Sequence, residues 1–168
     1  MKIKEYVKNI CVNAKSSSQE ISCLSESEKN IILESLIDEI NLYRNKIKDS
    51  NTNDIECLKT TDNFNNAFVD RLLIDDLRID SMISSIKEII EFKDPVGQIK
   101  DIELMPSGIK VGKMSMPLGV IAMIYESRPN VTIDASALCI KSGNSIILRC
   151  GSDSINTNIV LSECITKT

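Results

Sequence analysis

Two short polar segments follow the two most apolar runs of the sequence. Arg128-Pro129-Asn130 comes after the run 120–125, and Arg149-Cys150-Gly151-Ser152 comes after the run 145–148. The first segment places a guanidinium and an amide at the start of an expected helix, where free N–H groups favour an anion or a developing oxyanion. The second offers a guanidinium, a backbone N–H group and a hydroxyl to a phosphate.

Each segment also has a purely structural interpretation. Asn130 can act only as a helix cap with Arg128 solvated, and Ser152 can cap the next helix in an ordinary β–α turn. No G-x-G-x-x-G sequence follows either run, so the usual dinucleotide-binding fingerprint is absent. The residues alone therefore predict an anion-binding site and leave its chemistry open.

The cysteines do not indicate a metal site or a disulfide framework. The chain has six cysteines and no histidine, and no two cysteines form a C-x-x-C pair. A mixed Cys/His zinc site is thereby excluded. We expect scattered free thiols and no metal: Cys11, Cys23, Cys57, Cys139, Cys150 and Cys164.

Composition excludes several classes of partner. The 168 residues carry a net charge of −4, with acidic and basic residues interspersed. No block of like charge predicts binding to nucleic acid or to a membrane surface. The apolar runs are too short to span a bilayer, and the N-terminus does not read as a signal segment. We expect a cytoplasmic location.

Helical spacing dominates residues 1–97. Apolar residues recur at steps of three and four near the N-terminus and form a continuous stripe from Ile32 to Ile47. Ser25 and Glu28 form a capping box at the start of that second helix. The other expected elements are short helices at 54–59 and 67–73, a polar turn at 60–65, and a long helix at 79–90 that ends before Asp94-Pro95.

Strand patterns appear after residue 97. Residues 98–116 alternate around Pro106-Ser107-Gly108, which predicts a hairpin. The run 120–125 predicts a strand covered on both faces, followed by a helix at 131–140 with Gly143 after its end. A second strand at 145–149 and a helix starting near Asp153 complete a β-α-β-α unit with parallel strands. The predicted class is α/β, with a sheet that is incomplete.

Those same segments resemble the γ-glutamyl phosphate reductases, a branch of the aldehyde dehydrogenase superfamily. Residues 117–132 (PLGVIAMIYESRPNVT) resemble the family segment PLGVIGVIYESRPNVT, and residues 138–149 (LCIKSGNSIILR) resemble LCLKSGNAVILR. Weaker likeness extends upstream through the segments Asp94–Gln98, Asp70–Leu72 and Asn51–Asp54. The resemblance covers essentially the whole chain, as the N-terminal part of such a protein.

The resemblance implies a reaction and a role for several residues. NADPH reduces γ-glutamyl phosphate to glutamate γ-semialdehyde in proline biosynthesis, through a cysteine nucleophile. Asn130 matches the amide that stabilises the oxyanion, a contribution of about 3–4 kcal/mol. Arg149, with Gly151 and Ser152, matches the cofactor-binding position, and Arg128 is assigned to the substrate.

The resemblance also implies a division of the chain. Residues 1–97 form the N-terminal helical segment of the cofactor-binding domain, 98–116 an oligomerisation hairpin, and 117–168 the start of the Rossmann-like NADP-binding domain. The family nucleophile lies in an RPSTCN-type segment beyond Thr168, so we expect this chain to be inactive alone and its protein to be a homo-oligomer.

One departure from the family pattern and two alternatives accompany that expectation. The family has Arg-Gly-Gly where this chain has Arg149-Cys150-Gly151, and the extra side chain could crowd the cofactor phosphates. One alternative is another acyl-reducing relative, such as a coenzyme-A-acylating aldehyde dehydrogenase, although the ESRPNVT core argues against it. The other is a non-catalytic assembly or binding module.

Overall fold

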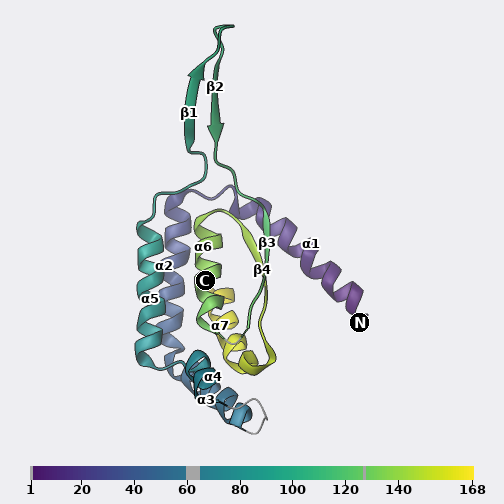
Figure 1. Cartoon of the computed structure of the whole chain (residues 1–168), viewed down its shortest axis with the longest axis vertical. Coiled ribbons are helices and arrows are strands. Elements are labelled where there is room, and N and C mark those ends of the chain that lie inside the picture. The colour runs from purple at the N-terminus through teal and green to yellow at the C-terminus, as the bar shows by residue number, and fades with distance from the viewer. Residues whose placement is uncertain (1, 60–64, 127) are drawn as a thin grey trace.

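The chain folds into a helical body from which a β-hairpin and the first helix extend (Figure 1). The computed structural model describes residues 2–59, 65–126 and 128–168. The predicted turn at 60–65 falls almost entirely outside these residues. The elements in chain order are α1 (Ile3–Ile21), α2 (Glu26–Leu42), α3 (Arg44–Lys59), α4 (Asn66–Leu72), α5 (Asp76–Glu91), β1 (Ile99–Leu104), β2 (Lys110–Met114), β3 (Val120–Ile124), α6 (Asn130–Lys141), β4 (Ser145–Arg149), a 3₁₀ turn (Ser152–Ser154) and α7 (Ile155–Lys167).

The hydrophobic core lies between α2, α5, α6 and α7. Burial of apolar side chains from all four helices, together with residues of α3 and of the α4–α5 link, supplies the main driving force for packing. The predicted helix at 79–90 is confirmed as α5, and its apolar stripe faces this core. The fully buried members of the core are Leu33, Leu36, Ile40, Ile47, Ile79, Ile86, Ile133, Ala137, Leu161 and Cys164.

The second and third helices meet at a bend that the sequence pattern did not predict. The capping box of Ser25 and Glu28 is confirmed at the start of α2, but α2 ends at Leu42 and α3 begins at Arg44. The expectation of one continuous stripe to Ile47 was therefore wrong, although Ile47 is buried. The expected short helix at 54–59 is only the last part of α3. Its first ten residues are mostly polar, and buried hydrogen bonds rather than an apolar stripe hold the helix.

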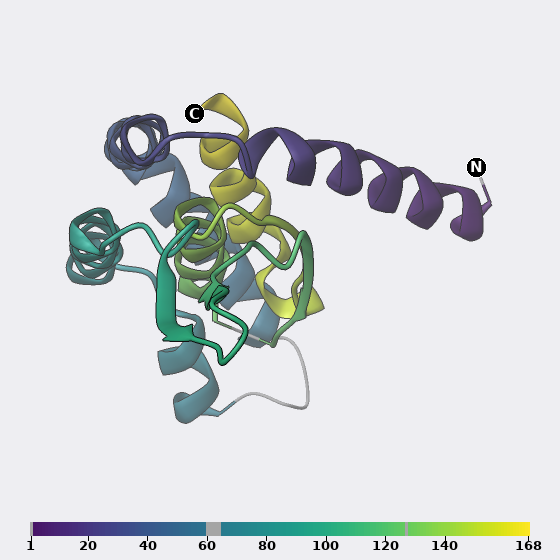
Figure 2. The same ribbon diagram turned by 90° about the horizontal axis from the view of Figure 1, so that it is seen from above.

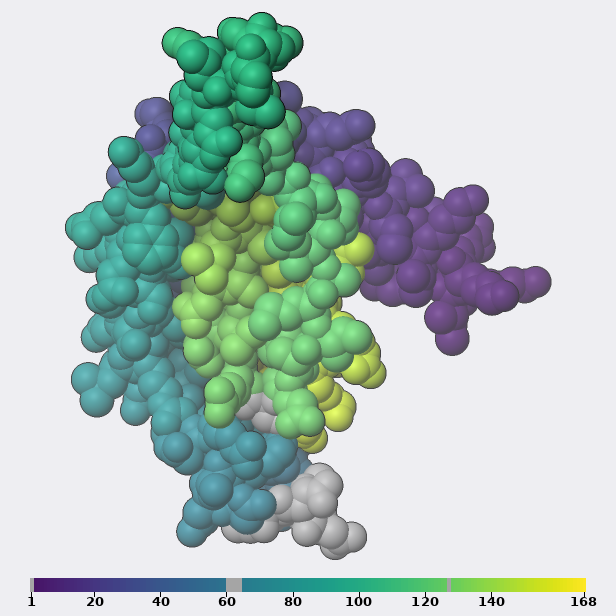
Figure 3. All heavy atoms as spheres, turned by 45° about the horizontal axis from the view of Figure 1, so that its top comes forward, coloured from purple at the N-terminus to yellow at the C-terminus, as the bar shows by residue number. Residues whose placement is uncertain are grey.

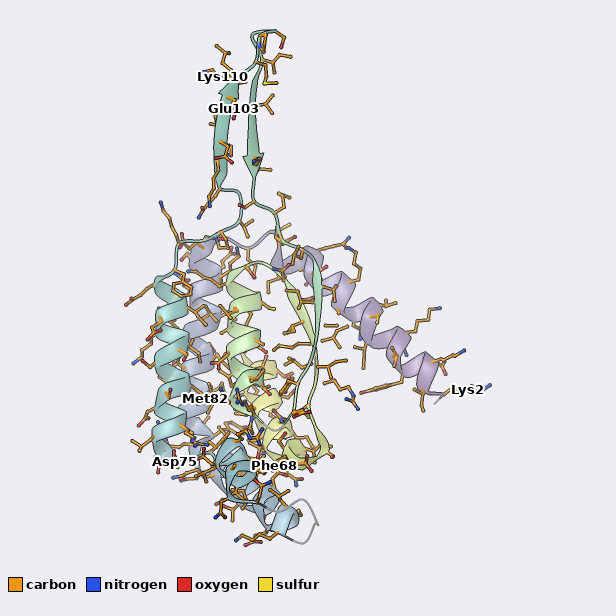
Figure 4. All side chains as sticks on the ribbon, in the orientation of Figure 1. Lys2, Phe68, Asp75, Met82, Glu103 and Lys110 are labelled. Atoms are coloured by element: carbon orange, nitrogen blue, oxygen red, sulfur yellow. The ribbon has the colours of Figure 1, made fainter. Side chains whose placement is uncertain are left out.

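The hairpin is confirmed and stands away from the body (Figures 1 and 3). β1 and β2 are antiparallel, and every residue of both strands is exposed, including the apolar side chains. Glu103 and Lys110 mark its two strands in Figure 4. A two-stranded ribbon with no covered face is marginal in water by itself. The surface of this hairpin is therefore suited to contact with another element.

Two buried lysines anchor the base of the hairpin. The Lys29 Nζ donates to the Asp94 carboxylate over 2.8 Å, and the Lys141 Nζ donates to the Ile90 carbonyl and to Asn30 Oδ1, each over 2.8 Å. Burial opposes ionisation of Asp94, but the Lys29 ammonium and the Val96 N–H group outweigh it, so the pKa of Asp94 is lowered. α2, α5 and α6 are thereby joined at the point where the hairpin begins.

β3 and β4 form a parallel pair, as predicted, with Val120 opposite Ser145 and Ile124 opposite Arg149. The expectation that β3 is covered on both faces was wrong: Met123 is 36% exposed and Ile124 is 74% exposed. α6 packs against β4 and α1 reaches both strands, but no described element covers the end of β3. The run is therefore more apolar than its observed burial requires.

The C-terminal part of α1 contacts the parallel sheet, and its N-terminal part extends away from the body (Figure 2). The Ser145 hydroxyl donates to the Ala14 carbonyl over 2.7 Å and fixes that end of the helix. Nearer the N-terminus, at least half of the surface of Ile3, Tyr6 and Val7 is exposed. None of the helices in the described part is long and apolar enough to cross a membrane.

Asp54 joins α3 to the start of α7. Its carboxylate accepts hydrogen bonds from the backbone N–H groups of Asn156 and Thr157, from the Thr157 hydroxyl and from the Asn156 amide, over 2.6–3.2 Å. These backbone groups belong to the first turn of α7, where the helix has no internal acceptors for them. Asn51, also in α3, adds a hydrogen bond to the Leu72 carbonyl.

We predict that Asp54→Ala lowers the free energy of unfolding by about 2–4 kcal/mol, because buried donors lose a charged acceptor. Urea denaturation followed by circular dichroism measures the change. Asp49→Ala removes an exposed carboxylate from the same helix and should cost less than about 0.5 kcal/mol. Equal effects of the two substitutions would contradict the capping role.

Candidate functional site

The two polar segments lie at one edge of the parallel sheet, where ligands bind in open α/β folds. Arg128 and Asn130 follow β3 and both line a cavity of about 360 Å³. Phe68 of α4 and Met82 of α5 mark this end of the body in Figure 4. The cavity is walled by the β3–α6 loop, by α4, by α5 and by the link between those two helices: Asp70, Arg71, Leu73, Ile74, Arg78, Ser81, Met82, Ser85, Pro129 and Asp134 complete it.

A buried side-chain network holds the β3–α6 loop in place. The Asn158 Oδ1 of α7 accepts from the Thr132 hydroxyl and from the Tyr125 hydroxyl. The Tyr125 and Thr132 hydroxyls also share a hydrogen bond. Burial raises the pKa of Tyr125, so its hydroxyl stays protonated and available as a donor. Tyr125, before Arg128, and Thr132, after Asn130, thus both bond to the side-chain amide of Asn158.

Asn130 is the first residue of α6, and Pro129 precedes it as the N-cap. The interpretation of Asn130 as a helix cap was therefore wrong, and its side chain is left to other partners. The Asn130 Nδ2 donates to the Asp134 Oδ2 one turn later, over 3.1 Å. The other carboxylate oxygen of Asp134 is buried and has no partner among the described residues. Burial raises the pKa of Asp134 despite the hydrogen bond from Asn130.

The second segment lies beside the first. The Tyr125 N–H group donates to the Arg149 carbonyl over 3.1 Å, and a Cβ placed on Gly151 would lie 3.7 Å from the Glu126 Cα. Arg149 and Ser152 are exposed. Ser152 does not cap α7: its own 3₁₀ turn starts after Gly151, and Ser154 precedes α7 without a side-chain cap. The hydroxyl of Ser152 therefore does not cap α7. The interpretation of Ser152 as the N-cap of that helix was wrong.

The described residues contain no group of three or more potential metal-binding side chains. Burial raises the pKa of Cys139, and it raises the pKa of Cys164 to about 11. Neither thiol is therefore a ready nucleophile at neutral pH. Cys150 lines a separate cavity of about 610 Å³ with Tyr125 and residues of α7.

Sequence reasoning missed the side of the cavity that α4 and α5 build. Arg71 and Arg78 reach it from elements far from the β3–α6 loop in the sequence. Asp134 was also missed, although its spacing of four from Asn130 places the two side chains on one helix face. The likeness at Asp70–Leu72 was the only signal that could have pointed to Arg71.

The sequence and the fold of the chain are both similar to those of known proteins. The γ-glutamyl phosphate reductase of Ruthia magnifica is 43% identical over 163 residues, which are 97% of this chain and 39% of that protein. The crystal structure of the reductase from Thermotoga maritima superposes with a TM-score of 0.86 at 34% identity, covering 92% of this chain and 37% of that one. The chain is a homologue of the γ-glutamyl phosphate reductases.

This homology covers only part of each relative. The chain spans about two fifths of the length of the reductases it matches. A Bacillus subtilis protein named as an aldehyde dehydrogenase superposes with a TM-score of 0.74 at 14% identity, which shows a shared fold alone. No protein-family model matches the sequence. The α/β class and the N-terminal part of the aldehyde dehydrogenase fold, both expected from the sequence, are confirmed.

We predict that Asp134→Asn stabilises the folded chain at neutral pH. Because the pKa of Asp134 is raised above its ordinary 3.8, stability falls as the pH rises from that value through the folded-state pKa. The asparagine variant has no charge to bury. Its advantage should be present at neutral pH and disappear below pH 3.8.

Thermal unfolding across this pH range measures the difference. Asp38→Asn, at an exposed site on α2, serves as the control and should change the unfolding temperature little. A loss of stability at neutral pH in Asp134→Asn would show that the ionised carboxylate is held by a partner and would contradict the prediction.

Proposed function

We propose that the protein to which this chain belongs reduces γ-glutamyl phosphate to glutamate γ-semialdehyde with NADPH, in the cytoplasm, as a step of proline biosynthesis. The observation that carries the proposal is the cavity beside Asn130 and Arg128, in a chain that is 43% identical to the Ruthia magnifica reductase over 163 residues. The site combines a neutral amide donor with arginine side chains at the carboxyl edge of a parallel sheet. This combination suits a substrate with an acyl oxygen and an attached phosphate.

Asn130 is proposed as the oxyanion stabiliser. Its amide Nδ2 is a donor on the first turn of α6, and its present acceptor, Asp134, is a partly buried carboxylate with a raised pKa. Protonation of Asp134 would weaken that hydrogen bond and release the amide for an acyl oxygen. Arg128 is proposed to bind the substrate, because its side chain lines the cavity and makes no hydrogen bond or ion pair within the described part of the chain.

The second segment fits an anionic cofactor. Arg149 and Ser152 are exposed donors, and Gly151 leaves space that a side chain would enter without a clash. The Asp153 carboxylate lies beside Gly151 and would oppose an anion there. We propose that these residues bind the phosphate-bearing part of NADPH. When bound, the cofactor supplies the hydride for the reduction. Cys150 lies between the two donors, and its side chain lines the neighbouring cavity.

The nucleophile is proposed to come from outside this chain. Cys139 and Cys164 have raised pKa values, and neither lines the cavity that Asn130 borders. We therefore expect this chain alone to have no reductase activity. The division into residues 1–97, 98–116 and 117–168 remains part of the proposal, with the hairpin as the oligomerisation element.

A chimera tests the function. This chain replaces the matching 163 residues of the Ruthia magnifica reductase, and the product is assayed for NADPH oxidation with γ-glutamyl phosphate. We expect activity, and we expect Asn130→Ala in the chimera to lower kcat by about 10²–10³-fold.

The control for the chimera is Asn45→Ala, an exposed amide of α3 far from the cavity, which should leave kcat unchanged. A folded chimera without activity would argue against the reductase and favour the assembly module. A chimera that reduces only a coenzyme-A thioester would favour the other acyl-reducing relatives.

A second prediction concerns the hairpin. Ile102 and Val111 are exposed apolar residues on the two strands, and pairing with a second copy would bury them. We expect the double substitution Ile102→Lys and Val111→Lys to convert an oligomer of the chain to a monomer in light scattering. Ile31→Lys, at an equally exposed site on α2, should leave the mass unchanged. A wild-type chain that is already monomeric would contradict this role.

A further inference from the structure

Two arginines border both cavities at the carboxyl end of β3. The cavity of about 360 Å³ holds Asn130, and a neighbouring cavity of about 400 Å³ is lined by residues of β3 and by Phe68. Arg71 of α4 and Arg128 of the β3–α6 loop line both of them. They are 57 positions apart in the sequence and are brought together only by the fold.

The charges around these arginines leave both of them available. Arg78 is occupied, because it pairs with Asp70 over 2.7 Å and donates to the Leu73 carbonyl over 2.8 Å. That pair also neutralises Asp70. Asp134 accepts a hydrogen bond from the Asn130 amide and forms no ion pair with either arginine among the described residues. Glu126 lines the second cavity but forms no ion pair with either arginine among the described residues.

Arg71 is oriented by its own helix. Its Nε donates to the Ala67 carbonyl over 3.2 Å, and its guanidinium lies 5.7 Å from the centre of the Phe68 ring. These contacts use one N–H group and one face of the guanidinium. The terminal amino groups have no partner in the part of the chain that the structure describes, and they form the fork that binds oxyanions. A side chain held in this way loses little further entropy when it binds an anion.

We propose that Arg71 and Arg128 together bind the phosphoryl group of the substrate, which makes Arg71 a further substrate-binding residue. The proposal rests on the proposed reductase function. Two guanidinium groups match the double charge of a phosphate, and each can bind it in a bidentate manner. In an acyl phosphate the phosphoryl group is joined through one bridging oxygen to the carbonyl carbon whose oxygen Asn130 would stabilise. The anion therefore has to lie next to Asn130, on the wall that the arginines form.

Binding of inorganic phosphate to this chain tests the proposal without any catalysis. Two-dimensional NMR at constant ionic strength gives the affinity and the residues whose amide signals shift. We expect shifts in the segments around Arg71 and Arg128, and we expect Arg71→Gln and Arg128→Gln each to weaken phosphate binding about tenfold. Lys110→Gln, which removes an equal charge from the exposed hairpin, should change the affinity by less than about twofold.

Two further measurements separate the alternatives. Arg71→Lys retains the charge without the fork and should give an intermediate affinity, which keeps the test informative if Arg71→Gln does not fold. Glutarate replaces phosphate as a carboxylate ligand of the same charge. Phosphate affinity that is unchanged in the folded Arg71 variants, shifts confined to the Arg149–Ser152 segment, or a dependence on the arginines for glutarate alone would each overturn the proposal.

The phosphate titration and the chimera assay test the two proposals separately. An inactive chimera together with arginine-dependent phosphate binding removes the reductase function and leaves an anion site. An active chimera with arginine-independent phosphate binding removes only the role of Arg71.

Discussion

The carboxylate of Asp54 is the contact on which the position of the candidate site depends. It accepts from the first N–H groups of α7 and so sets where that helix begins. α7 in turn carries Asn158, whose amide oxygen accepts from Thr132 and Tyr125 at the two ends of the β3–α6 loop. One buried acid in a helix of low apolar content thus determines the placement of a loop more than 70 residues away in the sequence. Buried networks of this kind are costly when only partly satisfied, so this chain of hydrogen bonds fixes Tyr125 and Thr132 against α7.

Some basic residues hold the fold together, and others are available to a ligand. Lys29 and Lys141 are buried and satisfied by carboxylates, carbonyls and an amide, so their charges act in holding α2, α5 and α6 together. Arg71 and Arg128 instead line cavities and keep donors available. A buried ammonium with fixed partners stabilises a junction, whereas an arginine fork at a cavity wall is suited to a ligand. These four basic residues thus have two different roles.

The exposed apolar surfaces have a common physical meaning. The end of β3, the hairpin and the N-terminal part of α1 all present side chains that an isolated domain would be expected to bury. The homologous reductases are about two and a half times as long as this chain, and its sheet has two strands. The apolar pattern of β3 predicted burial that the described residues do not provide, because Met123 is 36% exposed and Ile124 is 74% exposed.

Local sequence determined most of the elements and their order. The capping box at Ser25, the stripe of α5, the turn at Pro106–Gly108 and the glycine after α6 each depend on neighbouring residues, and all were predictable for that reason. The position of Arg128 and Asn130 after a strand of a β-α unit was predictable in the same way, because ligands of open α/β sheets bind at the carboxyl ends of strands. What the tertiary structure decided depends on contacts between distant segments. The bend at Tyr43, the helical state of residues 44–53 and the position of Arg71 beside Arg128 follow from the packing of α3 against α4 and α7, and no local pattern contains that information.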